Sequence, residues 1–378
     1  MMNCELRQLN TFIKSCSTSN AAIKNTASPI PKEGWYPAYS ASGQDVWLPE
    51  YRYSGKGIVV SAVGARCGKC FQADGKWNVT ANTHVLLVDE SIADYKYCWY
   101  LLNNESWWIK SGSGQPFVKV KDSLNRSILL PDLSTQQHIA TILDKISEGI
   151  ALCRKMMDEL DLMVKAKFGE MFGDPLINPK HYPVHQLSEH IRFLTSGSRG
   201  WAKYYSDEGE WFITIKNVKN CNISVDDVQC ITPPQNAEAD RTRLKEGDLL
   251  ISITADLGRT GVVTKEIAEH GAYNNQHLTC IRLDQSALVP LYVAYFMESS
   301  AGKAQFEAKN MSAVKAGLNF DAIRSLKLIV PPLEQQNQFA LFVTQIKKSQ
   351  LTIRGIFDKM EMEKLALMQE YFNQASKL

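Results

Sequence analysis

The sequence contains no long hydrophobic run and no cysteine pattern of the kind that disulfides impose. No apolar stretch approaches the roughly 20 residues that a membrane-spanning helix needs, and the first residues lack the apolar core of a secretory signal. The nine cysteines are odd in number and scattered, which is typical of proteins in a reducing compartment. We therefore expect a cytoplasmic protein with no membrane partner.

The sequence also lacks a strong excess of positive charge. Its 42 basic and 40 acidic residues leave a net charge of +2, and only residues 1–130, with 14 basic and 10 acidic side chains, lean basic. A protein that binds DNA alone usually has a larger basic bias, because phosphate neutralisation dominates its affinity. If nucleic acid is the partner, other chains must supply part of the phosphate contacts.

Motifs for metal binding, nucleotide binding and catalysis are missing or incomplete. CGKC at 67–70 has no second Cys or His pair at zinc-site spacing, and the surrounding stretch departs from a phosphate-binding loop in spacing and in its last residue. His181, His185 and His190 lack the glutamate of a metalloprotease helix. NPKHY at 178–182 differs from the Asn-Pro-Pro-Tyr motif of amino-methyltransferases at its third residue. We expect no metal, no catalytic residue and no cofactor bound by this chain.

A helix-start signal occurs twice, 200 residues apart. LPDLSTQQHIATIL at 130–143 and VPPLEQQNQFALFV at 330–343 share a proline, a leucine, a glutamine and then an apolar run. Proline presets the backbone dihedral at a helix entrance, and polar residues fill the first turn. The repeat therefore predicts two helices that begin in the same way.

Each of these helices continues with apolar residues at alternating spacings of four and three. Such a heptad pattern predicts a long helix that packs lengthwise on another helix, and Gly173 and Pro175 predict the end of the first one. We expect the two helices to pack on each other as an antiparallel coiled coil. The predicted contact seam comprises Ile139, Leu143, Ile146, Ile150, Met157, Leu160, Phe339, Val343, Ile346, Ile353, Phe357 and Met360.

The segments before the two helices also repeat, more faintly. GKGIVVSAVGARCGK at 55–69 aligns with EGDLLISITADLGR at 246–259, each a short apolar strand followed by a turn. With 378 residues, the chain is too long for one ordinary core. We predict an α+β protein with pseudo-two-fold symmetry: a first block at 1–130, a first helix at 131–174, a second block at 175–330 and a second helix at 331–378.

Polar and aromatic residues that suit DNA cluster in both blocks. Arginine fits guanine edges, Asn and Gln fit adenine edges, and Ser, Lys and backbone amides fit phosphates. For any single residue a solvated loop with packing aromatics is an equally good explanation. The candidate DNA-binding residues are Tyr39, Ser40, Ser42, Lys56, Arg66 and Lys69 in the first block, and Ser196, Ser198, Arg199, Trp201, Lys203, Tyr204, Asn275 and Gln276 in the second.

The order of block, helix, block, helix resembles the specificity (S) subunits of type I restriction-modification systems. The two helix starts, KFGEMFGDP at 167–175, YPAYSASG at 37–44 and TSGSRGWAKYYSDEGEWFI at 195–213 are similar to segments of that family. The resemblance covers essentially the whole chain. It implies a non-catalytic DNA reader whose two blocks, the target recognition domains, each read half of a bipartite target.

The resemblance also implies partners. Two modification subunits, which bind S-adenosylmethionine and methylate adenine, would dock along the helices that set the spacer, and motor-nuclease subunits that use ATP and Mg would join for restriction. The alternative is a coiled-coil scaffold protein that never contacts DNA. Salt-dependent binding to duplex DNA in the presence of a modification subunit distinguishes the two functions.

Overall fold

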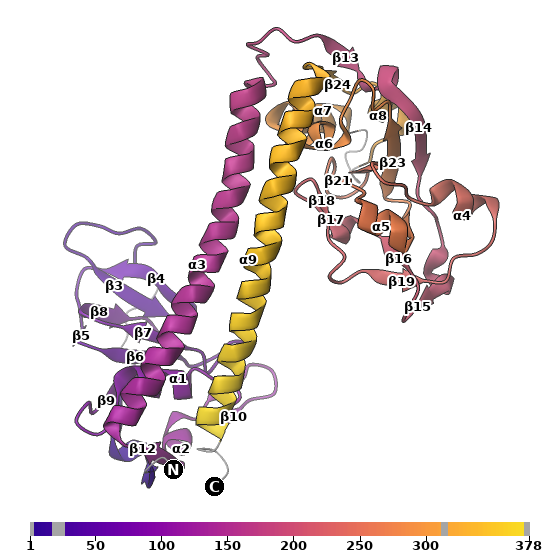
Figure 1. Ribbon diagram of the computed structural model, residues 1–378. Helices are drawn as coiled ribbons and strands as arrows, with labels where there is room; N and C mark the ends of the chain where they lie inside the picture. The colour runs from indigo at the N-terminus through magenta and orange to yellow at the C-terminus, as the bar shows by residue number, and fades with distance from the viewer. Residues whose placement is uncertain (1–3, 17–26, 311–316, 374–378) are drawn as a thin grey trace. The chain divides into compact units, whose positions relative to one another are not determined.

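The computed structural model describes residues 4–16, 27–310 and 317–373 (Figure 1). The chain divides into two compact units: unit 1 consists of Met1–Lys155 and Ile353–Leu378, and unit 2 of Met156–Thr352. Two long helices, α3 (Leu133–Phe172) and α9 (Leu333–Asn373), each contribute one part to each unit. The remainder of each unit is a mixed α and β block, which confirms the predicted α+β class.

Unit 1 is built on two four-stranded sheets. In neighbour order the first, antiparallel throughout, is β2 (Ile13–Cys16), β9 (Thr83–Val88), β6 (Gly57–Ser61) and β7 (Cys70–Ala73). The second is β4 (Gly43–Leu48), β3 (Tyr36–Ser40), β8 (Lys76–Val79) and β5 (Tyr53–Ser54), with β3 and β8 parallel. The smaller elements are β1 (Cys4–Gln8) paired with β12 (Ser127–Pro131), β10 (Lys110–Ser111) paired with β11 (Phe117–Val118), η1 (Leu9–Thr11), α1 (Tyr95–Leu102) and α2 (Val120–Leu124).

Unit 2 repeats this plan. Its antiparallel sheet is β14 (Ile191–Ser196), β23 (Leu278–Leu283), β20 (Leu249–Ser252) and β21 (Thr260–Val262). Its second sheet is β15 (Tyr205–Ser206), β19 (Gln229–Ile231), β16 (Glu210–Ile213) and β22 (Ala272–Asn274), with β16 and β22 parallel. The smaller elements are β13 (Val184–Gln186) paired with β24 (Lys327–Ile329), β17 (Val218–Lys219) paired with β18 (Asn222–Ile223), η3 (Leu187–His190), η4 (Trp201–Tyr204), η5 (Ile215–Asn217), α4 (Ala237–Thr242), α5 (Lys265–His270), α6 (Pro290–Glu298), α7 (Ser300–Lys309) and α8 (Phe320–Arg324).

The aligned strands β6 and β20 occupy the same place in their sheets, so the predicted duplication is confirmed. Both strands are buried along their whole length, as expected for short runs of Val, Ile and Leu between two strand neighbours. Gly57 begins β6 where a Cβ atom would overlap the ring of Trp77. A glycine is required there because the indole packs directly on the strand backbone.

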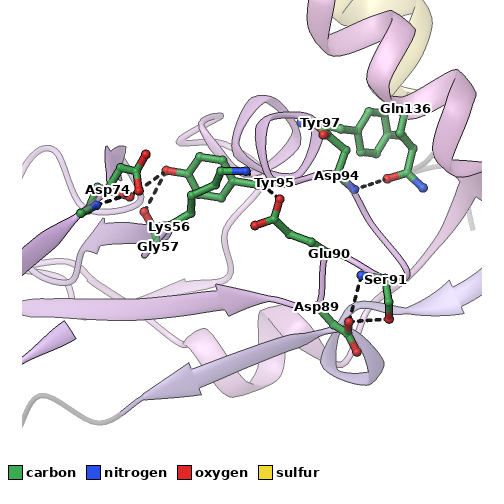
Figure 2. Close-up of polar contacts among 12 residues, drawn as sticks. Lys56, Gly57, Asp74, Asp89, Glu90, Ser91, Asp94, Tyr95, Tyr97 and Gln136 are labelled. Atoms are coloured by element: carbon green, nitrogen blue, oxygen red, sulfur yellow. Dashed lines mark hydrogen bonds and ion pairs between the residues drawn. The ribbon is translucent and has the colours of Figure 1, made fainter. Parts of the chain in front are cut away.

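A buried glutamine joins the start of α3 to the block of unit 1. The Gln136 side chain is fully buried, and its Oε1 accepts a hydrogen bond from the backbone N–H of Asp94 at 2.8 Å (Figure 2). Its Nε2 donates to the carbonyl oxygen of Pro131 at 2.8 Å. Asp94 is in turn the N-cap of α1, so one amide ties together the starts of two helices.

The same contact recurs in unit 2. Gln336 is fully buried, accepts from the backbone N–H of Val289 at 2.9 Å and donates to the carbonyl oxygen of Pro331 at 2.8 Å. Val289 is the N-cap of α6. The glutamine shared by the two helix-start motifs thus has a structural reason, because its amide satisfies backbone groups that burial would otherwise leave without a partner. We call Gln136 and Gln336 the glutamine anchors.

The first long helix ends where the sequence predicts. Gly173 has φ +76°, and its N–H donates to the carbonyl oxygen of Gly169 at 2.8 Å. The Nζ of Lys180 donates to the carbonyl oxygens of Glu170 and Met171, at 3.0 and 2.7 Å. Glycine tolerates the left-handed conformation, and a cation satisfies helix carbonyls that have no partner within the helix.

Within each unit the parts of α3 and α9 pack on each other in antiparallel fashion (Figure 1). In unit 1, Arg154 forms an ion pair of 3.0 Å with Glu361. In unit 2, the Nε2 of Gln350 donates to Asp161 at 2.8 Å, and the rings of Phe168 and Phe339 lie 5.4 Å apart. Of the predicted seam, Ile139, Leu143, Ile146, Ile150, Phe339, Val343, Ile346 and Ile353 are buried, while Met157, Leu160, Phe357 and Met360 are partly exposed.

The glutamine anchors generate a stability prediction. Gln136→Leu keeps the side-chain volume but leaves the buried N–H of Asp94 and carbonyl of Pro131 without their partner, at about 1–3 kcal/mol for each group. We expect the free energy of unfolding of the chain to fall by about 2–6 kcal/mol in urea denaturation followed by tryptophan fluorescence. The exposed neighbour provides the control, since Gln137→Leu should change it by no more than about 0.5 kcal/mol. Equal midpoints for the two variants would contradict the anchor role.

Candidate nucleic-acid interface

In unit 2 the structure brings two predicted segments together. The backbone N–H of Ser198 donates to the carbonyl of Asn274 at 2.8 Å, and the N–H of Gln276 donates to the carbonyl of Ser198 at 3.1 Å. Between them, a Cβ atom at Gly197 would overlap the carbonyls of Asn274 and Asn275. The glycine therefore permits the close approach of the two loops. Residues 196–204 and 274–277 thus lie side by side, and we call these two segments together the unit 2 loop surface.

Two of the predicted contact residues on this surface are buried supports. Ser198 is 2% exposed and shares a hydrogen bond of 2.8 Å with the hydroxyl of Thr242. Trp201 is 3% exposed, packs against Phe212, and its Nε1 donates to Glu238 at 3.2 Å. Their side chains have no surface to offer to DNA. The aromatic and hydroxyl groups fill the core beneath the loop, and the DNA contact of these two residues stays a prediction that their burial does not support.

The other predicted residues of this surface are accessible. Arg199 and Lys203 are exposed, and Ser196, Tyr204, Asn275 and Gln276 are partly exposed. The Nζ of Lys203 lies 4.9 Å from the ring centroid of Tyr204, a geometry that holds the cation over the aromatic face. These side chains remain candidates for contact with a ligand.

Further polar residues at this surface were not found from the sequence. Arg241 on α4 donates to the carbonyl of Ser196 at 3.1 Å, and Thr254 Oγ1 lies 2.9 Å from Nδ1 of His277. These residues come from segments about 45 and 20 positions away, so no local pattern signals their proximity. Thr254 follows the strand that the internal repeat aligns with β6, and that alignment was the one available signal.

Beside the same surface, Arg243 and Tyr273 form a polar pair. The guanidinium of Arg243 donates to the Tyr273 hydroxyl at 3.0 Å and forms an ion pair of 2.9 Å with Glu210. Burial and the neighbouring Glu210 carboxylate raise the pKa of the Tyr273 hydroxyl, so it remains neutral at physiological pH. With its charge paired, Arg243 serves mainly to hold β16 and β22 in place.

In unit 1 the predicted residues are divided between two regions. The backbone N–H of Ser42 donates to the hydroxyl of Ser40 at 3.0 Å, which shapes the turn between β3 and β4. The next residue, Gly43, faces the ring of Phe71, and the Nζ of Lys69 lies 5.8 Å from that ring. Ser42 is exposed and Lys69 partly exposed, but Ser40 is 6% exposed. Ser40 therefore supports the turn, and its DNA contact stays a prediction that its burial does not support.

The second region contains Tyr39 and Lys56. Both line a hollow of about 470 Å³. Tyr39 packs its ring edge-on to Trp77, and burial raises the pKa of its hydroxyl. Lys56 forms an ion pair of 2.8 Å with Glu90 (Figure 2). Arg66 is exposed on the loop that joins β6 and β7.

The motifs that suggested metal or catalysis have structural explanations. Cys70 is buried with its thiol 3.3 Å from the carbonyl of Leu102, and burial raises its pKa well above the usual range. His185 and His190 stack at 5.1 Å, with Nδ1 of the first 2.8 Å from Nε2 of the second. Burial and the neighbouring His185 lower the pKa of His190. Across residues 4–16, 27–310 and 317–373, no group of three or more His, Cys, Asp or Glu side chains is placed to hold a metal ion.

Comparison with known proteins agrees with this architecture. The model of a family described as "Type I restriction modification DNA specificity domain" matches residues 11–162 and 211–359. The specificity subunit of the type I restriction enzyme MjaVIII from Methanocaldococcus jannaschii is 21% identical over 294 residues, which are 73% of this chain and 69% of that protein. The EcoKI specificity subunit from Escherichia coli K12 is 21% identical over 235 residues, 58% of this chain and 50% of that protein.

Solved structures show the same fold. The crystal structure of the type I restriction-modification S subunit from M. genitalium superposes with a TM-score of 0.64 at 13% identity, covering 97% of this chain and 96% of that one. A chain from a structure of the type I R-M system gives a TM-score of 0.53 at 14% identity, covering 96% and 97%. With the family model matched in two successive segments, this chain belongs to the type I restriction-modification DNA specificity subunits, with two target recognition domains.

Proposed function

We propose that this chain is the non-catalytic subunit that selects the DNA sequence in a type I restriction-modification complex. The two blocks, 1–130 and 175–330, each read one half of a bipartite target. The observation that supports this most strongly is that one mixed-sheet fold is built twice and fixed twice, by equivalent glutamine anchors, to a pair of antiparallel helices. Two like readers on a common support fit a target with two separate halves.

The helix pair sets the unread spacer between the two halves. Each long helix contains about 40 residues, which corresponds to a length of roughly 60 Å at 1.5 Å per residue. A packed pair of helices is stiff because bending one requires repacking of the seam. The number of base pairs between the half-sites is therefore a property of the helices and not of the reading surfaces.

The outer faces of the helices support docking of two modification subunits. Large apolar side chains are exposed there, including Met156 and Leu162 on α3 and Ile356 and Met362 on α9, all between 40% and 69% exposed. Exposed apolar groups in such number mark interaction surfaces. Met156 corresponds to Ile356 and Leu162 to Met362 at the 200-residue offset of the repeat, which suits two copies of one partner.

The partner subunits provide the chemistry and the remaining charge. Because the basic and acidic residues of this chain nearly balance, the partner subunits make many of the contacts with DNA phosphates. S-adenosylmethionine binds to the modification subunits, and ATP and Mg bind to the motor-nuclease subunits that join the complex for restriction. This division of labour is supported by the incomplete metal, nucleotide and methyltransferase motifs of this sequence.

The complex acts in the cytoplasm, where its DNA substrate lies. The nine cysteines, all free thiols, support a reducing compartment. Separately, none of the helices in the described parts of the chain combines the length and apolarity required to cross a membrane.

Substitutions at two neighbouring cations of the unit 2 loop surface, Arg199 and Lys203, distinguish a contact with a base from a contact with phosphate. Arg199→Ala in the complex with modification subunits should weaken binding by about 1–3 kcal/mol and relax selectivity at one position of one half-site, because a bidentate guanine contact is lost. Lys203→Ala should lower affinity for all sequences alike and reduce its salt dependence. Competition binding on a library randomised at each position provides the measurement. Arg199→Lys keeps the charge without the planar fork, and a normal profile for this control would exclude bidentate reading.

An exchange of the first block tests whether each block recognises its own half-site independently of the other. When residues 1–130 are replaced by the equivalent block of a relative, with the residues that face α3 and α9 retained, methylome sequencing should show one half-site changed. The other half-site and the spacer should persist, because base contacts belong to each block and the spacer to the helices. If an intact complex changes both half-sites, the two blocks read DNA jointly.

A further inference from the structure

A short turn on the unit 2 loop surface is held by backbone contacts on three sides. Asn275 donates its N–H to the carbonyl of Ile213 at 3.0 Å, and Gln276 donates to the carbonyl of Ser198 at 3.1 Å. The carbonyl of His277 accepts from the N–H of Ile253 at 3.0 Å. The backbone of residues 275–277 is thus fixed to three other segments, while the side chains of Gln276 and His277 are partly exposed.

The side chains of this turn form a linear hydrogen-bonded relay. Nε2 of Gln276 lies 3.3 Å from Nε2 of His277, and Nδ1 of His277 lies 2.9 Å from Oγ1 of Thr254. The amide nitrogen can only donate, so Nε2 of the imidazole accepts. A neutral imidazole then has its proton on Nδ1 and donates it to the threonine hydroxyl. Thr254 therefore fixes the tautomer of His277, and His277 fixes the orientation of the Gln276 amide.

This orientation leaves a defined pattern on the outer edge of the amide. One N–H of Gln276 donates to His277, and the amide keeps its second N–H together with Oε1, which accepts no hydrogen bond from any residue that the structure describes. A donor and an acceptor side by side match the N7 acceptor and N6 donor of adenine in the major groove. Guanine presents two acceptors there and would leave Oε1 facing a lone pair.

Resting on the proposed function, we propose that Gln276 reads an adenine in the second half-site, and that His277 and Thr254 are positioning residues that set the direction of its amide. Gln276 makes the bidentate base contact, while His277 and Thr254 do not touch the base. Because the turn is fixed before DNA arrives, little ordering is required on binding.

Unit 1 contains a related turn at the equivalent place, with different side chains and with φ +66° at Asn82. There Thr80 donates its N–H to the carbonyl of Tyr39 at 2.9 Å, and the carbonyl of Asn82 accepts from Ala62 at 2.9 Å. Ala81 takes the place of Gln276, and Asn82 that of His277. Two of the three backbone contacts therefore form in unit 1 without the relay, so neither a glutamine nor a histidine is required for those two contacts.

The test uses the full chain assembled with its modification subunits. Competition binding is measured against duplexes in which each base pair of the second half-site is replaced in turn, and methylation of the same set is recorded. The variants are Gln276→Ala, Gln276→Glu, His277→Phe, Thr254→Val and Thr254→Ser. Thermal unfolding of each complex identifies any variant that fails to fold. Gln276→Ala is expected to fold, because unit 1 has alanine at the equivalent position, Ala81.

Gln276→Ala should reduce binding to the parental target about 5- to 100-fold and remove the preference at one adenine only. Gln276→Glu, which presents acceptors alone, should shift that position towards cytosine, whose N4 group donates. His277→Phe and Thr254→Val should relax the same position with less effect on binding to other sequences. Thr254→Ser retains the hydroxyl and should restore the parental profile, a rescue that a purely structural role of the methyl group would not produce.

Three results would overturn the inference. The first is a base preference of Gln276→Ala that equals the parental one at every position. The second is a loss of affinity of Gln276→Ala that is the same for all sequences. The third is a guanine, instead of an adenine, at the position whose preference Gln276→Ala removes. In each of these the parental complex still selects its target, so the proposed function stands. A parental complex that shows no sequence selectivity would instead reject the proposed function itself.

Discussion

The buried amide at the start of each long helix is the contact on which the rest of the architecture depends. Apolar packing between a helix and a block is non-directional and tolerates small rotations. The anchors Gln136 and Gln336 tolerate much less, because each amide bonds backbone groups of two different elements and none of these groups can be left buried without a partner. The helix therefore leaves its block in one direction.

The far ends of the helices add a second constraint of a different kind. In unit 2, Phe172 near the end of α3 packs against Tyr292 at 4.8 Å between ring centroids. In unit 1, Phe372 near the end of α9 packs against Tyr97 at 5.2 Å. The core of each unit is therefore completed by a helix that begins in the other unit. Neither block has a complete core without both helices, so the folding of the two units is coupled.

Sequence reasoning predicted the parts of this protein that repeat at short range. The heptad spacing from Ile139 onward, the proline at each helix entrance and Gly173 at the end of α3 are local signals, and the helices follow them within one or two residues. The duplication was visible because β6 and β20 are both short runs of aliphatic residues. Periodicity and turn chemistry act between residues that are close along the chain.

The sequence indicated which loop segments lie together with polar and aromatic residues, but not which of their side chains are buried. The unpredicted burial has one physical cause. Ser198 and Trp201 have residue types that suit DNA, yet they are buried by Thr242 and Phe212, which come from distant segments. Whether a hydroxyl or an indole supports a loop or faces solvent depends on such long-range neighbours, and sequence spacing does not encode them. The proximity of Thr254 to the adjacent residues Gln276 and His277 was not predicted for the same reason.

The turns at 80–82 and 275–277 occupy equivalent places in the two units and carry different side chains. Two backbone hydrogen bonds are common to both turns, and every residue except proline can donate such a bond. These two bonds do not depend on which side chain is present, whereas at Gln136 the amide itself is the structural element. A recognition surface can change without loss of stability only at positions of the first kind. Alanine in one unit and glutamine in the other stand at equivalent places beside these shared backbone bonds, as expected where a bond does not involve a side chain.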